Sequence, residues 1–110
     1  MEQHIRAIAE FDASHTDTTR VRCQRGHGHH WTVTVEKRIS GEADLEVDLH
    51  ALIAEWQDRD LNEMLHVKDV SVVQVAAWTM ERLLLVHPTI VRVEVGDGRL
   101  LGICTQELRR

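Results

Sequence analysis

The stretch HHWTVTVEKRI, residues His29 to Ile39, indicates the kind of fold that this chain adopts. It is rich in β-branched residues, and Trp31, Val33 and Val35 alternate with the polar residues between them. Alternation with a period of two is the pattern of a strand that buries one face. We therefore predict a strand over His29–Ile39.

Three further strands are predicted on either side of this stretch. Apolar and polar residues alternate over His4–Phe11, whereas the polar residues 14–25 show no period and are predicted to form a loop. Later in the sequence, the apolar runs Ile90–Val95 and Arg99–Cys104 flank Gly-Asp-Gly at 96–98. A short glycine-rich turn between two such runs is a strong hairpin signal.

Two helices are predicted between the second and third strands. Asp48 can cap the first helix, whose apolar residues share one face: Leu49, Leu52, Ile53 and Trp56. The second helix begins near Ser71, carries a wide apolar stripe and stops before Pro88. The order strand, strand, helix, helix, strand, strand predicts one α+β domain over residues 1–110, a four-stranded antiparallel sheet with both helices on one face. Such a sheet has two open edges, through which copies of the chain can pair.

The composition is that of a folded globular domain, and it argues against several functional classes. The 110 residues are 43% hydrophobic and 28% charged, and 13 Lys and Arg against 18 Asp and Glu give a net charge of -5. A negative domain without a basic stripe is poorly suited to nucleic acids or anionic membranes. No window is apolar enough to span a bilayer, and MEQHIRAIAEF lacks the features of a signal peptide, so we expect a cytoplasmic protein with two separate thiols.

The segment CQRGHGHHW, from Cys23 to Trp31, concentrates reactive side chains around the start of the central strand. In extended backbone, His27 and His29 share a face with Cα atoms about 6.6 Å apart, which suits two ligands of one metal ion. His15, at the end of the preceding strand, supplies a third imidazole if the two strands pair antiparallel. Three neutral nitrogens with a fourth position open are the arrangement of a catalytic zinc site.

A simpler interpretation of the same residues stays open. In a chain with eight histidines, several lie close together by chance, exposed and without an ion, and an H-x-H pair alone is a weak signal. His30 faces away from its neighbour His29 and is not expected to be a ligand. Cys23 is either a thiolate nucleophile or base, activated by a nearby metal or imidazolium, or a small buried apolar residue.

Two motifs in this region resemble those of the 6-pyruvoyltetrahydropterin synthase and 6-carboxytetrahydropterin synthase family. FDASH, residues 11–15, matches the family's F-x-A-x-H strand end, and CQRGHGH, residues 23–29, matches its C-x-x-x-H-G-H. The resemblance implies the tunnelling fold (T-fold), in which protomers join edge to edge into a trimeric barrel and two trimers stack into a hexamer. It also implies that His15, His27 and His29 bind Zn²⁺ and that Cys23 is the catalytic thiol.

The resemblance weakens at the family's L-D-H-x-x-L-N stretch, whose Asp and His act with the Cys in proton transfer. Alignment on Leu61-Asn62 places Gln57 and Asp58 at these two positions. If the chain is instead shortened after the first helix, His66 takes the place of the family His, without an Asp beside it. Both alignments stay open, so that Asp58 and His66 are both candidate catalytic residues.

The residue that anchors the pterin in the family is also changed. An ungapped alignment of the V-x-V-x-E-T motif places the family Glu at Val95, and Glu94 then faces the other side of the strand. The anchor matters because a carboxylate that accepts two hydrogen bonds specifies the edge of the pterin ring. A register slip or bulge would return Glu94 to the pocket, and Glu94 is therefore the candidate pterin-binding residue.

Three hypotheses for the function follow. The resemblance implies a zinc-dependent carbon–oxygen lyase acting on 7,8-dihydroneopterin triphosphate or a related pterin, whose product in bacteria usually leads to 7-deazaguanine compounds such as queuosine. The altered relay and anchor favour a divergent paralogue that keeps the zinc site but has another substrate or only binds a ligand. The third hypothesis is an oligomer whose histidines store or sense zinc.

Overall fold

A computed structural model of the chain describes residues 1–20 and 27–108, with the backbone alone of His27. Within these residues the elements are β1 (His4–His15), β2 (His27–Arg38), α1 (Leu45–Ala54), α2 (Leu61–Leu65), α3 (Val72–Leu84), β3 (Ile90–Gly96) and β4 (Leu101–Thr105). The strands form one antiparallel sheet in the order β1-β2-β3-β4. The predicted α+β class and the four-stranded antiparallel sheet are therefore confirmed.

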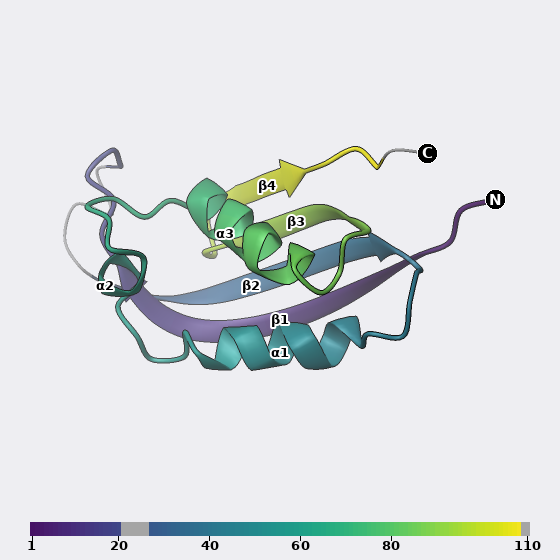
Figure 1. The fold of residues 1–110 in the computed structure, drawn as a ribbon. Coiled ribbons are helices and arrows are strands. Elements are labelled where there is room, and N and C mark those ends of the chain that lie inside the picture. Colours follow the sequence, from purple (N-terminus) through teal and green to yellow (C-terminus); the bar gives the residue numbers. More distant parts are fainter. Residues whose placement is uncertain (21–26, 109–110) are drawn as a thin grey trace.

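The alternation along the strands gives the sheet one covered and one uncovered face. The covered face carries a continuous apolar core, to which the strands contribute Ala7, Ala9, Phe11, Ala13, Trp31, Val33, Val35, Val93 and Val95. Helix α1 packs along β1, whereas α3 packs on β3 and β4 (Figure 1). The uncovered face is mostly polar and charged. Its polar residues include Arg6, Glu36 and Glu94, which remain partly or largely exposed.

Helix α1 begins earlier than the sequence pattern predicts, and the expectation that Asp48 caps it is wrong. The N-cap is Asp44, whose extended backbone (φ -88°, ψ 105°) lets its carboxylate accept from the N–H of Val47 at 3.1 Å. Asp48 lies inside the helix. Helix α3 is capped by Ser71 as predicted, in a reciprocal capping box with Gln74.

A short helix, α2, lies between the two predicted helices, so the expectation of only two helices is wrong. Asp60 caps α2 by accepting from the N–H of Asn62 at 3.0 Å, and His66 ends it in the left-handed conformation with φ of 55°. A helix this short shows no apolar periodicity, which explains why the pattern does not predict it. Helix α2 and the end of β1 lie at the opposite end of the molecule from the N-terminus (Figure 1). None of the helices described is long and apolar enough to cross a membrane.

Candidate metal centre

His15, the last residue of β1, is buried near α2 with 1% of its surface exposed. Its Nδ1 lies 2.8 Å from the carbonyl oxygen of Val70. Because a carbonyl only accepts hydrogen bonds, Nδ1 carries the proton and the ring's lone pair is on Nε2. The side chain of Asn62 links the residue that follows β1 to the segment before Val70. It bonds the backbone N–H and carbonyl of Thr16 (2.7 and 2.9 Å) and the carbonyl of Lys68 (2.7 Å).

The start of β2 is in register with the end of β1. The backbone of His27 pairs with that of His15, and His29 pairs with Ala13. The imidazole of His29 approaches that of His15, with ring centroids 4.9 Å apart. Trp31 packs edge-on against the His15 ring at a centroid distance of 4.8 Å, so a rigid indole supports this end of the core. The antiparallel pairing expected to bring His15 beside the H-x-H pair is present.

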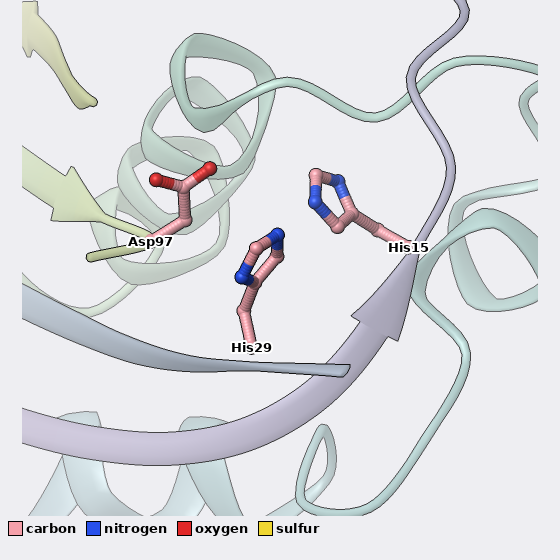
Figure 2. A group of neighbouring side chains, drawn as sticks. All are labelled: His15, His29 and Asp97. Atoms are coloured by element: carbon pink, nitrogen blue, oxygen red, sulfur yellow. The ribbon is translucent and has the colours of Figure 1, made fainter. Parts of the chain in front are cut away.

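Asp97, in the turn between β3 and β4, approaches the same two imidazoles. One carboxylate oxygen of Asp97 and one nitrogen each of His15 and His29 lie within 4.8 Å of one another. Figure 2 shows the three side chains pointing toward a common centre from β1, from β2 and from the turn after β3. Three separate segments of the chain thus converge on this point.

The Asp97 side chain is fully buried, and both of its oxygens accept hydrogen bonds. Oδ2 accepts from Arg20 Nη1 at 2.7 Å, and Oδ1 accepts from the N–H groups of Arg99 and Leu100, each at 3.0 Å. Burial by itself raises the pKa of a carboxyl. Here the bonds from Arg20 and Leu100 and the positive charge of Arg20 outweigh burial, so the pKa of Asp97 lies below its ordinary value of 3.8. Asp97 is therefore ionised at neutral pH.

The donors in this group fit zinc. Imidazole nitrogens and carboxylate oxygens are ordinary Zn²⁺ ligands at about 2.0–2.2 Å. A histidine that binds a metal usually donates its other N–H to a carbonyl or carboxylate, which fixes the tautomer and the ring plane. The contact from His15 to Val70 is of this kind. To hold a zinc ion, the donor atoms of His15, His29 and Asp97, now up to 4.8 Å apart, must approach to the roughly 3.4 Å that separates two tetrahedral ligands.

Asp58, one of the two predicted relay residues, lies at the outer edge of β1, beside Asp12. Its backbone has φ of 59°, its N–H donates to the carbonyl of Asp12 at 2.6 Å, and its carboxylate accepts from Gln57 at 3.1 Å. Asp58 and His29 border the same open depression of about 360 Å³ from opposite sides of β1, with Asp12, Ala13, Ser14, Gly28, His30 and Arg59.

Of the other predicted catalytic residues, only His66 lies in the part of the chain that the structure describes. His66 is the exposed C-cap of α2 and is not among the described residues that line this depression. Cys23 lies outside the described residues, as does the side chain of His27. The roles of these three residues stay predictions.

Glu94, the candidate pterin-binding residue, faces the uncovered side of the sheet. There it lines a separate cavity of about 180 Å³ with Arg6, Thr34, Glu36 and Arg92. The register shift between β2 and β3 lies at Glu36 and Lys37 and leaves the pairing of Glu94 regular. Val95 is fully buried in the core. The structure does not bring Glu94 together with His15 and His29.

His30 faces away from the imidazole pair, as predicted. Its Nδ1 lies 2.9 Å from a carboxylate oxygen of Asp12 on the uncovered side. This hydrogen bond raises the pKa of His30 and lowers the pKa of Asp12 from their ordinary values. His30 is therefore a useful control for His29, since the two are neighbours in sequence on opposite faces of one strand.

The sequence pattern predicts the turn at 96–98 but does not identify Asp97 as part of the site. The signal was present in the alternation of β3, because Val93, Val95 and Asp97 are spaced two residues apart. One further step along this alternation places Asp97 on the covered face. A Gly-Asp-Gly sequence is typical of a turn, and its aspartate is ordinarily attributed to turn formation alone.

These features define a class of fold, a four-stranded antiparallel meander with helices on one face, and the site lies where β1 ends and β2 begins. No family model and no curated protein matches the sequence. Among solved structures, the chain is similar to 6-pyruvoyl tetrahydropterin synthase of Caenorhabditis elegans, with a TM-score of 0.81 and 16% identity over 97% of each chain. It is also similar to an uncharacterized protein of Wolinella succinogenes, with a TM-score of 0.73 and 14% identity over 97% of this chain and 99% of that one. The chain therefore has a 6-pyruvoyl tetrahydropterin synthase-like fold at low sequence identity.

Proposed function

We propose that this protein is a zinc-dependent lyase of the 6-pyruvoyltetrahydropterin synthase type, acting on 7,8-dihydroneopterin triphosphate or a related pterin. The observation that carries the proposal is the 2.8 Å contact between His15 Nδ1 and the carbonyl of Val70. It gives a buried imidazole the tautomer that a metal ligand needs, beside a second imidazole. The two sequence motifs and the similarity of the fold to the synthase support the same function.

In this proposal His15, His27 and His29 hold the zinc ion. When bound, zinc supplies stabilisation of the negative charge that develops on the oxygens of the substrate side chain. Cys23 is the proposed base that takes a proton from the adjacent carbon. Asp58 is the proposed relay carboxylate in preference to His66, because it lines the same depression as His29.

A second candidate function is favoured by the lack of a carboxylate at the position where the family's glutamate anchors the pterin. Val95 is fully buried, and Glu94 faces the opposite side of the sheet. The expected pair of hydrogen bonds to a pterin edge therefore has no carboxylate at the anchor position. This arrangement suits a divergent paralogue that keeps zinc but acts on, or only binds, a different small molecule.

The proposed active form is a homo-oligomer. β1 and β4 are the outer strands of the sheet, and outer strands have backbone groups available for pairing with another chain. The family resemblance implies a trimeric barrel and a hexamer of two stacked trimers. Light scattering after size-exclusion chromatography tests this, and a monomer at micromolar concentration would argue against it.

The test of the proposed function is turnover of 7,8-dihydroneopterin triphosphate by zinc-loaded protein, with zinc content measured on the same sample. We expect one zinc per chain and a tetrahydropterin product that Cys23→Ala removes. His29→Ala should lose both zinc and turnover, whereas the matched variant His30→Ala should keep its zinc. Stoichiometric zinc without turnover would favour the second candidate. Zinc content that does not change in His29→Ala would overturn the site.

A further inference from the structure

Asp97 brings a buried carboxylate to a site that otherwise consists of imidazoles. Its side chain is fully buried, and a buried carboxylate needs good hydrogen-bonding partners. Arg20 and two backbone N–H groups are such partners. A carboxylate oxygen of Asp97 also lies within 4.8 Å of a ring nitrogen of each of His15 and His29.

The known bonds of Asp97 leave it able to bind one more group. Each carboxylate oxygen has about two lone-pair directions. Oδ1 uses its capacity on the N–H groups of Arg99 and Leu100, which shape the turn. Oδ2 accepts one bond, from Arg20 at 2.7 Å. Oδ2 can therefore bind a cation without losing the turn or the ion pair.

The direction from which the Asp97 side chain approaches the two imidazoles also favours a role as a metal ligand. His15 and His29 reach the centre from β1 and β2, and Asp97 reaches it from the turn after β3, so the three donors lie around one point (Figure 2). A carboxylate that only closed the turn could lie at the surface, as most aspartates in turns do. Asp97 instead points inward on the covered face.

We propose that Asp97 is a protein ligand of the metal ion held by His15 and His29. The inference rests on the proposed zinc site and extends it, since a three-histidine site leaves this position open. With Asp97 as an additional ligand, the chain supplies a fourth donor, the net charge of the site falls by one, and a substrate oxygen would have to bind as a fifth ligand. The site then holds zinc more tightly than the imidazoles alone, and it is a weaker Lewis acid.

The experiment uses the full chain loaded with zinc or with Co²⁺, whose visible absorption reports the number and type of ligands. Zinc affinity is measured by competition with a chromophoric chelator for wild type, Asp97→Asn and Asp97→Ala. Asp44→Asn is the control, because it neutralises a carboxylate at the α1 cap, where asparagine caps equally well. We expect the Asp97 variants to bind zinc at least about 10-fold more weakly and to change the Co²⁺ spectrum, with no change in the control.

If Asp97→Asn and Asp97→Ala fold poorly, a variant that gains an absorption band provides a second test. In a Cys23→Ser background, Asp97→Cys should add a thiolate-to-Co²⁺ charge-transfer band in the near ultraviolet. Wild-type affinity and an unchanged spectrum in both Asp97→Asn and Asp97→Ala, or no such band in the cysteine variant, would overturn the inference while leaving the proposed function intact. A wild-type protein that binds neither zinc nor Co²⁺ would overturn both.

Discussion

A histidine is buried next to a carboxylate at each end of the covered face of β2, and the histidine has a different role at each end. At one end, Lys37 Nζ lies 2.8 Å from His87 Nδ1, and His87 Nε2 lies 2.6 Å from a carboxylate oxygen of Asp48. At the other end, His15 bonds a backbone carbonyl through Nδ1, and its ring lies beside His29. Lys37 and His29 are eight residues apart, or about 26 Å along a strand.

The difference lies in the source of the positive charge. Lys37 donates to Nδ1 of His87, which therefore accepts, and Nε2–H of His87 donates to Asp48. Both ring nitrogens are thus bonded to charged side chains of the protein, and this end is complete as a structural network. At the His15 end, Nδ1 of His15 bonds a backbone carbonyl, Arg20 pairs with Asp97, and we propose that zinc adds further positive charge. In this proposal, the same residue types serve stability at one end and ligand binding at the other.

The largest expected effect is the loss of the lysine-end network. His87→Ala leaves the buried Lys37 ammonium without its closest partner, and removing one member of a buried charged network costs about 3 kcal/mol or more. Urea unfolding should show this loss of unfolding free energy, while the folded variant still binds one zinc per chain. His50→Ala, an exposed histidine of α1, is the control. A His87 variant as stable as wild type would show that the network contributes nothing.

The next effect comes from zinc at the opposite end. A ligand that binds only the folded state at 100 times its dissociation constant adds about 2.7 kcal/mol to the unfolding free energy. Wild type and His87→Ala should both gain this amount in urea unfolding with zinc, and His29→Ala should gain none. An equal gain in His29→Ala would mean that zinc binds elsewhere.

A smaller effect separates the two helix caps. Ser71→Ala and Asp44→Ala each remove a side chain that caps a helix, which costs about 1 kcal/mol of unfolding free energy. Ser71 directly follows Val70, whose carbonyl orients His15. Only Ser71→Ala should therefore also weaken zinc binding, measured by chelator competition. Equal zinc affinity in both variants would show that the cap does not position the carbonyl.

The smallest effect concerns an exposed ion pair on the other face of β2, beside Lys37. The hydrogen bonds from Arg6 and then His4 hold the pKa of Glu36 below its ordinary value of 4.5. A lowered carboxyl pKa stabilises the fold above pH 4.5, and this contribution is lost as the pH falls through the folded-state pKa. Urea unfolding of wild type and Glu36→Gln should differ by a few tenths of a kcal/mol at neutral pH and converge in acid. A difference that grows in acid would contradict this assignment.

The sheet was predictable because its strands follow simple rules. Alternation of apolar residues identifies β1 and β2, and the glycine-rich turn identifies the hairpin of β3 and β4. The cap of α1 was not predictable in the same way, since Asp44 and Asp48 are both suitable residues and the backbone conformation decides between them. The short helix α2 depends on tertiary contacts of Leu61 and Asn62 rather than on its own pattern.

The site was predictable where strand register decides it. The H-x-H spacing and the antiparallel pairing are enough to place His15 near His29. Asp97 is distant in sequence and lies in a turn whose residues are also explained by turn formation, so only the folded chain shows its direction. The place of Asp58 depends on how the chain returns after α1 to the edge of β1, which no local pattern encodes.

That return segment has a consequence for the outer edge of β1. The N–H of Asp58 bonds the carbonyl of Asp12, the N–H of Ser14 bonds the carbonyl of Arg59, and Ser14 forms a parallel bridge with Asp60. The chain thus occupies this edge itself along Asp12–Ser14. In the homo-oligomer proposed above, a strand of another copy would be blocked along Asp12–Ser14 and could pair only with the earlier part of β1. The return segment therefore limits how two copies can align at this edge.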